Sequence, residues 1–489
     1  MKEGKYPMKK IRLYCLAALV LLGTLLAATA AAGAQAAGYQ SVRGIEVEFT
    51  PSPRTGRYRF EVYEAGSQET ACSKSFDSLT GEQAVFLPVE CLPEKTYTIK
   101  VTALPEPGRE GLDAASSKEQ AFTPQPVCGH TAAEGGFLYG SGTADDPYIV
   151  SCPAQLRHLD HDAHRRAGQY FLQSRDIDLL DPAFYRDGEP FDADSDPENG
   201  NWVPIAKQHS ANTGFIGQYD GAGHSLYNLS YCATGNATDM GTYGYDSGVF
   251  GYVSEGIIQN LGVENFSFSG KLFGAGGIVG ASHYNASIRG CRAINGTLEA
   301  PSCGGIAGYF HASSGNLALS DCYSAGVEVK ITISNSSYTY HAGGGIAGYL
   351  FCSTGYSAQL HNSYSLPNAM GGTAVPGAVV GSRLLHSSFN YGSVSDSYYL
   401  SGSASYGIGS PASNSGAAPL GEAAFAAESS FPGWDFVDTW TMGEVIYTDV
   451  SGSERTISAP VLQAFERRES GARTQGVASP ERASIGLSQ

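Results

Sequence analysis

The sequence predicts an all-β protein in which a parallel β-solenoid follows a small β-sandwich. Glycine accounts for 62 of the 489 residues, and the 29 tyrosines outnumber the 21 phenylalanines. This composition favours stacked strands with tight turns over packed helices. A glycine-ended tetrad recurs between residues 248 and 381. Before it, short alternating or continuous apolar runs are typical of sandwich strands.

The N-terminus has the pattern of an export signal. Basic residues at positions 9, 10 and 12 precede an apolar run from Leu13 to about Ala30, and the mostly small residues at 32–37 suit cleavage near residues 34–37. We therefore assign residues 1–37 to a signal peptide and predict an extracellular or cell-surface protein. The alternative is an uncleaved anchor helix, which would be the only membrane attachment, because the run is nearly long enough to span a bilayer.

Residues 38–124 form the predicted sandwich. A Leu92-Pro93 turn leads to Tyr97 and an alternating strand that ends near Ala103. This pattern resembles the start of the sixth strand of a fibronectin type III domain, here with a short first half. The resemblance implies that the Tyr97 hydroxyl bonds to the backbone a few residues upstream. Residues 125–136 are predicted to be a linker.

Residues 137–462 form the predicted solenoid. A helical stretch from Pro153 to about Ala167 places Leu156 and Leu159 on one face. We expect it to cap the solenoid end, where exposed strand edges would otherwise recruit other chains. After Leu462 the chain becomes polar, and residues 463–489 are predicted to be a disordered tail.

The repeats themselves are marked by the tetrads. Their first residues are separated by 29, 28, 40 and 33 positions, and the long step carries an insertion near Ile331–His341. Short apolar strands of this kind bury themselves only by stacking on neighbouring repeats. We expect the tetrad glycines to occupy corners of the coil, where the backbone has positive φ. After each tetrad, Asn, Asp or Ser is followed by Cys or Tyr, and we expect these side chains to stack in register from coil to coil. Each repeat is long enough for one long coil or two short ones. The tetrads begin at Gly248, Gly277, Gly305, Gly345 and Ala378.

Each tetrad is followed by a short segment in which an apolar residue precedes Asn, Asp or Ser. This combination resembles the GLUG motif of bacterial surface proteins. That motif also occurs in the non-catalytic region of IgA-cleaving metallopeptidases. The flanks fit as well, with G-T-A-D-D-P-Y-I at 142–149 and the closing segment from Phe431 to Trp440. The resemblance, over about Phe137 to Leu462, implies a right-handed parallel β-helix at the cell surface. It implies no defined activity, and the sequence contains no H-E-x-x-H.

Ten cysteines include one in the signal, which leaves an odd number, nine, in a mature chain. Cys72 could bridge to Cys91, and Cys128 to Cys152. No pair has the C-x-x-C spacing of a zinc or redox site. In the repeats we expect buried thiols that stack from coil to coil, namely Cys291, Cys303, Cys322 and Cys352.

Charge and acid–base chemistry limit the function classes. A net charge of −17 opposes binding to nucleic acid and to anionic membranes. Glycosidases need two facing carboxylates, and β-helix lyases need acids for Ca²⁺ beside a base. The acids and bases of the repeats are scattered, so we predict neither an enzyme nor a cofactor. Between Lys271 and Ser401 the acids are Glu299, Asp321, Glu328 and Asp396, and the bases include Arg289, Arg292 and Arg383.

Three histidines lie on the predicted capping helix. His158, His161 and His164 are spaced three apart, so neighbouring members could chelate a metal. The first and last do not converge on a continuous helix, and no third ligand is obvious. We therefore predict a solvated helix face and no metal site.

The leading hypothesis is a non-catalytic exported surface protein that acts as an adhesin-like binding or spacer scaffold. Its partner would be a host glycan, the extracellular matrix or a cell-envelope polymer. The alternatives are a carbohydrate-active β-helix enzyme, either polysaccharide lyase or hydrolase, and a ligand-free envelope structural protein. Candidate ligand-facing aromatic residues, which could instead form a packing ladder, are Tyr338, Tyr340, Tyr349 and Tyr356.

Overall fold

The computed structural model describes residues 8–18, 40–49, 57–77, 83–104, 116–185, 188–196, 199–234, 245–332, 341–366, 370–371, 376–383 and 389–466. The chain divides into two compact units, residues 1–149 with 479–489, and residues 150–478. The boundary falls inside strand β8 (Tyr148–Val150), which pairs with β9 (Tyr170–Gln173) in the sheet of the second unit.

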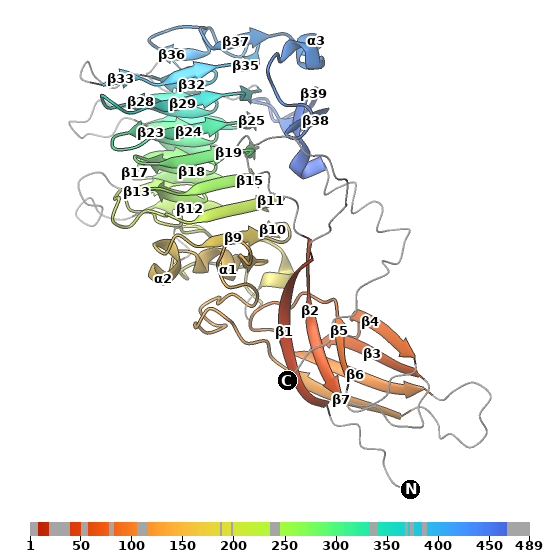
Figure 1. The fold of residues 1–489 in the computed structure, drawn as a ribbon. Helices are drawn as coiled ribbons and strands as arrows, with labels where there is room; N and C mark the ends of the chain where they lie inside the picture. The colour runs from red at the N-terminus through yellow and green to blue at the C-terminus, as the bar shows by residue number, and fades with distance from the viewer. Residues whose placement is uncertain are drawn as a thin grey trace, which may run out of the picture. The chain divides into compact units, whose positions relative to one another are not determined.

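The first unit contains two antiparallel sheets (Figure 1). Alternating side chains form its core, and Phe60, Val62 and Ile99 are fully buried. The backbone N–H of Leu92 donates to the Tyr97 hydroxyl oxygen over 2.9 Å, which confirms the predicted hydrogen bond at this corner. One sheet has the order β1 (Met8–Ala18), β2 (Gln40–Phe49), β5 (Gln83–Leu87), and the other β4 (Thr70–Asp77), β3 (Arg57–Glu64), β6 (Tyr97–Leu104), β7 (Ser116–Phe122).

Strand β1 lies within the segment assigned to the export signal. It pairs antiparallel with β2, from Met8 opposite Phe49 to Ala18 opposite Gln40. The rest of the predicted signal, residues 1–7 and 19–37, lies outside the described residues. Export and cleavage stay predictions. Among the described residues, no helix has the length and apolar character needed to cross a bilayer.

The predicted linker is folded into tight turns. The N–H of Val127 donates to the carbonyl of Phe137 over 2.7 Å, and the N–H of Thr131 donates to the Glu134 carboxylate over 2.8 Å. We call residues 124–152 the lead-in segment, because it continues through β8 into the first parallel sheet.

Two short helices replace the single predicted one. Helix α1 (Pro153–His158) and helix α2 (Asp162–Arg165) are separated because His161 is extended and caps α2 through its side chain. Leu156 and Leu159 are fully buried. Both helices lie beside β9 at one end of the solenoid, and helix α3 lies at the other end (Figure 1).

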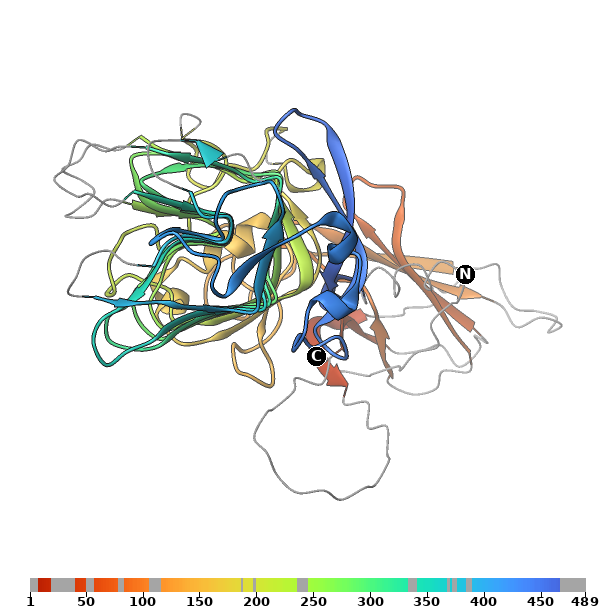
Figure 2. The same ribbon diagram turned by 90° about the horizontal axis from the view of Figure 1, so that it is seen from above.

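The second unit is a solenoid of four stacked parallel sheets. Figure 2 looks down the stack and shows successive coils lying over one another. The largest sheet contains β8, β9, β10 (Ile177–Asp178), β11 (Gln218–Tyr227), β15 (Ile257–Glu264), β19 (Ala286–Arg289), β20 (Arg292–Ile294), β24 (Leu317–Ser320), β25 (Tyr323–Ala325), β29 (Ala358–His361), β30 (Tyr364–Ser365), β34 (Ser393–Ser395), β35 (Ser397–Leu400) and β37 (Ala417–Leu420).

Three further sheets complete each coil. The second holds β12 (Ser230–Ala233), β16 (Ser267–Gly270), β21 (Thr297–Ala300), β26 (Glu328–Ile331) and β31 (Met370–Gly371). The third holds β13 (Tyr245–Ser247), β17 (Leu272–Gly276), β22 (Ser302–Gly304) and β27 (Ala342–Gly344). The fourth holds β14 (Phe250–Val253), β18 (Val279–Ser282), β23 (Ala307–Ala312), β28 (Ala347–Cys352), β32 (Val380–Ser382) and β36 (Ile408–Ser410), with β33 (Asn390–Tyr391) antiparallel to β28.

Each repeat supplies one coil. The strand register aligns one apolar position from coil to coil, which buries a continuous core as the repeats predict. The aligned residues are Ile258, Ile288, Leu319, Leu360 and Val394. The parallel β-solenoid that the sequence predicts is therefore observed.

The tetrad glycines have a different role from the predicted one. All of them lie in the described residues, and none has positive φ. They are instead in close contact with the next coil. A Cβ on Gly305 would lie 2.2 Å from the carbonyl oxygen of Gly345, and one on Gly345 would lie 2.1 Å from that of Ala378. The prediction of glycine corners is wrong, because these positions lack room for a side chain.

The left-handed corners lie further along each repeat, in the largest sheet. One equivalent position per coil has positive φ and carries Asn, Asp or Gly. Short polar side chains tolerate this conformation, and glycine adopts it without steric cost. The residues are Asn260 (φ 52°), Gly290 (61°), Asp321 (53°), Asn362 (49°) and Asp396 (45°).

A C-terminal hairpin covers one flank of the solenoid. Its strands, β38 (Trp440–Thr448) and β39 (Glu454–Leu462), share a core with the stacked tyrosines Tyr323 and Tyr364. The ring centroids of these tyrosines lie 5.0 Å apart, as the predicted stacking requires. Short helical segments occur at η1 (Pro182–Phe184), α3 (Glu422–Phe425) and η2 (Glu428–Ser430).

The first residues of the predicted disordered tail are ordered. Phe465 is 3% exposed and belongs to the core beneath the hairpin. Its ring centroid lies 4.1 Å from the guanidinium carbon of Arg292, so burial and a cation–π contact order this turn. Residues 467–489 lie outside the described residues.

The nine cysteines from Cys72 to Cys352 form no disulfide with one another, so neither candidate bridge is present. The predicted thiol ladder is partly correct. Cys291 and Cys322 precede Arg292 and Tyr323, which are register partners, and the two thiols interact. Cys303 and Cys352 lie in other sheets and do not extend this ladder.

Candidate functional site

The predicted ligand-facing aromatic residues do not form one exposed surface. Tyr349 is 5% exposed and packs in a core cluster, with its ring centroid 5.8 Å from that of Tyr309. Tyr349 is therefore a packing residue, which was the alternative interpretation. Tyr356 is 41% exposed and remains accessible. Tyr338 and Tyr340 lie outside the described residues.

Tyr349 shares its cluster with a column of histidines that the sequence pattern did not single out. His209 Nδ1 lies 2.7 Å from Oδ2 of Asp246, whose side chain is fully buried. The ring centroid of His283 lies 4.8 Å from that of His209 and 5.1 Å from that of His311. His311 stacks on Phe351, with ring centroids 4.4 Å apart. Three histidines thus lie among the aromatic rings of this cluster.

The surroundings keep two of these histidines neutral. Burial, reinforced by repulsion from His209, lowers the pKa of His311 to about 4. Burial, with repulsion from His209 and His311, lowers the pKa of His283 well below its usual range. Burial also raises the pKa of Asp246, and the His209 partner opposes that rise. This column suits packing at neutral pH better than proton transfer.

We expect the column to make the solenoid sensitive to acid. An unfolded histidine takes up a proton near pH 6.5, whereas His283 and His311 in the folded protein do not until the pH is much lower. Stability is therefore full above pH ~6.5 and falls towards pH 4, by up to about 1.4 kcal/mol per pH unit for each proton. Thermal unfolding measured from pH 7.5 to 4.5 checks this.

The matched variants for this prediction are His311→Gln and His361→Gln. His311→Gln removes one titrating group and should flatten the dependence of the melting temperature on pH. His361→Gln, outside the column, should leave the slope unchanged. Equal slopes in wild type and His311→Gln would contradict the prediction.

One partly buried ion pair of the repeats is used in packing. Arg292 Nη2 lies 2.8 Å from Oε1 of Glu264 and 3.2 Å from the hydroxyl oxygen of Ser225. Phe465 lies over the same guanidinium. This pair therefore stabilises the junction between the solenoid and the C-terminal turn.

The capping helices bring together two histidines that a continuous helix would keep apart. The break between α1 and α2 turns the chain, so His158 and His164 face each other with ring centroids 4.9 Å apart. Both are buried, with 4% and 2% exposure. The ring of His161 instead accepts a hydrogen bond from the N–H of Ala163 through Nδ1 and caps α2. The expected solvated histidine face is wrong, because the helix is not continuous.

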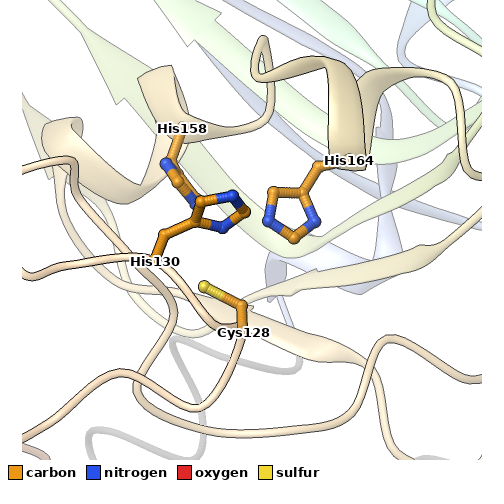
Figure 3. Close-up of side chains that lie close together, drawn as sticks. All are labelled: Cys128, His130, His158 and His164. Atoms are coloured by element: carbon orange, nitrogen blue, oxygen red, sulfur yellow. The ribbon is translucent and has the colours of Figure 1, made fainter.

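Two side chains of the lead-in segment complete a cluster with this pair. Cys128, His130, His158 and His164 each offer one ligand atom, and all four atoms lie within 4.8 Å of one another. Figure 3 shows the four side chains turned towards a common point. One thiol and three imidazoles are ligands that transition metals prefer.

Neighbouring groups orient two of these side chains. His164 Nδ1 lies 2.7 Å from Oε1 of Gln169, which leaves Nε2 for the cluster when Gln169 accepts. The backbone N–H of Phe137 donates to Sγ of Cys128 over 3.3 Å, which holds the sulfur in place. Hydrogen bonds that hold the ligands from behind in this way are typical of metal sites.

The sequence contains a signal for this cluster that the C-x-x-C spacing does not reveal. Cys128-Gly-His130 is a C-x-H pair in the predicted linker, and His158 and His164 are separated by five residues. Only the turn at His161 and the path of the lead-in segment bring the two pairs together.

Comparisons with known proteins give limited similarity. No family model matches the sequence. Over 135 residues, 27% of this chain, the sequence is 32% identical to Halomucin of Haloquadratum walsbyi. The chain spans only 1% of the length of that relative.

One solved structure also resembles the chain. It is a protein of Bacteroides ovatus provisionally described as an immunoglobulin A1 protease. The match covers 68% of this chain and 96% of that chain, with 19% sequence identity and a TM-score of 0.40.

Proposed function

We propose that the protein is an exported, non-catalytic scaffold that binds or spaces polymers outside the cell. The observation that carries the proposal is the regular solenoid, in which one coil per repeat builds a long lateral surface from four parallel sheets. Stacked repeats of this kind provide extended binding surfaces. The partly buried Arg292–Glu264 pair and the neutral side chains of His283 and His311 are consistent with structural roles for these polar groups.

In finer terms, the proposal is a fibronectin type III-like module followed by a GLUG-repeat array at the cell surface. The Tyr97 hydrogen bond supports the first assignment, and the single coil per tetrad supports the second. The apolar N-terminal run supports export. The sequence similarity to a segment of the far longer Halomucin is consistent with an extracellular setting.

Accessible aromatic side chains are the first candidates for polymer contact, because an aromatic ring combines a large apolar surface with a polar edge. Tyr356, Tyr391 and Tyr406 are 41%, 54% and 41% exposed, and each follows or belongs to the last coils of the solenoid. Aromatic rings of this kind stack on sugar rings and on peptide side chains.

The test uses the purified chain on arrays of glycans, matrix proteins and envelope polymers. We expect saturable binding to one polymer class, reduced about tenfold or more in a Tyr356→Ser, Tyr391→Ser, Tyr406→Ser triple variant. The control is Val437→Ser with Val450→Ser, since these exposed side chains, 79% and 72%, are not aromatic. If the chain binds no polymer on any array, the binding role is contradicted. If it releases shortened glycan products, the non-catalytic assignment is contradicted.

A further inference from the structure

We propose that Cys128, His130, His158 and His164 bind one zinc ion through a thiolate and three imidazoles. All four ligand atoms lie within 4.8 Å of one another. Tetrahedral zinc with bonds of about 2.0–2.3 Å separates its ligands by roughly 3.3–3.8 Å. Side-chain rotations that move the ligand atoms by about 1 Å therefore bring all four to bonding distance of one ion.

The ligand chemistry selects the metal class. Ca²⁺ and Mg²⁺ require oxygen ligands, and the cluster offers none. One thiolate with three imidazoles suits a tetrahedral transition-metal site, and zinc takes such sets without redox chemistry. Cys128 and His130 are partly buried and His158 and His164 are buried, so the ion is shielded from bulk water.

The surrounding chain prepares two of the ligands. Gln169 contacts His164 Nδ1, which directs Nε2 to the metal. The Phe137 N–H donates to Cys128 Sγ and fixes the position of the sulfur. Such outer contacts set ligand orientation and typically change metal affinity about 10- to 100-fold when removed. Gln169 is thus a positioning residue.

The site is structural in character. Four protein ligands fill the coordination of zinc and leave no open position for substrate or water. The ion ties the lead-in segment to α1 and α2, which pack at the first coil, where the Asp160 carboxylate accepts the N–H of Ala206 over 2.7 Å. Zinc thereby locks the start of the solenoid. The proposed zinc site does not depend on polymer binding by the solenoid.

The test uses the full chain without a polyhistidine tag, stripped of metal with a chelator. Zinc titration by calorimetry should give one ion per chain, and the melting temperature should rise with zinc. Co²⁺ loading should give visible bands of tetrahedral intensity and a thiolate-to-metal charge-transfer band. The Cys128→Ser variant should lose that band, and His158→Asn or His164→Asn should weaken zinc binding by about 100-fold or more.

Matched controls separate the site from adventitious binding. Cys72→Ser removes a thiol elsewhere, and His361→Gln removes a histidine at the end of β29, away from the cluster; both should keep wild-type affinity. Gln169→Ala should bind zinc about 10- to 100-fold more weakly while keeping the charge-transfer band. No zinc binding by the wild type, or unchanged binding in both Cys128→Ser and His158→Asn, overturns the proposal.

One measurement avoids dependence on variants that fail to fold. X-ray absorption of the zinc-loaded wild type should resolve one sulfur and three nitrogen ligands. Coordination by oxygen alone, or without sulfur, overturns the proposal.

Discussion

Replacing Trp440 with alanine is expected to lower the free energy of unfolding by about 3–5 kcal/mol. Trp440 begins β38 and is fully buried. Its ring centroid lies 4.6 Å from that of Trp434 and 6.1 Å from that of Tyr364. The substitution leaves a cavity where the hairpin packs on the tyrosine column.

A lost hydrogen bond adds to this cost. Trp440 Nε1 donates to Oδ1 of Asp321 over 3.2 Å, and Asp321 occupies one of the left-handed corners. The tryptophan therefore links the C-terminal hairpin to a corner of the solenoid. Removing it exposes the flank of Tyr323 and Tyr364, which the hairpin otherwise covers.

Urea unfolding followed by circular dichroism measures the effect. The control is Ile446→Ala on the same strand, because Ile446 is 53% exposed and its loss should cost less than about 1 kcal/mol. Similar midpoints for the two variants would show that the hairpin contributes little to the fold.

Replacing Gly345 with alanine is expected to destabilise the solenoid by about 3 kcal/mol. A Cβ at this position would lie 2.1 Å from the carbonyl oxygen of Ala378 and 2.2 Å from the hydroxyl oxygen of Ser365. One of these atoms belongs to the backbone of the next coil. That backbone can retreat only by weakening the hydrogen bonds that join the coils.

The control is Gly421→Ala. Gly421 has an ordinary φ of −75° at the N-cap of α3, and a Cβ added there would meet no atom within 4 Å, so its substitution should cost about 1 kcal/mol or less. Both variants are compared by thermal and urea unfolding. Wild-type stability in Gly345→Ala would refute the close-approach explanation for the tetrad glycines.

The repeat architecture was predictable because its signals are local and recur. Strands at tetrad spacing must stack to bury their apolar residues, and the register of Ile288 with Leu319 follows that spacing. Tyr97 was predictable for the same reason, since its partner Leu92 lies five residues upstream. The role of the tetrad glycines could not be predicted in this way, because the contact of Gly345 with Ala378 joins different coils.

The candidate site shows the limit of sequence patterns most clearly. His158 and His164 looked divergent on one helix, and only the extended conformation of His161 turns them together. Cys128 and His130 then meet them through the path of the lead-in segment.

The sequence by itself determined the coil repeat, the parallel stacking and the buried apolar register, because these follow from periodic burial along the chain. The tertiary structure decided which polar side chains converge. Those neighbours come from separate segments, and their distances depend on helix breaks and turns that no spacing rule specifies.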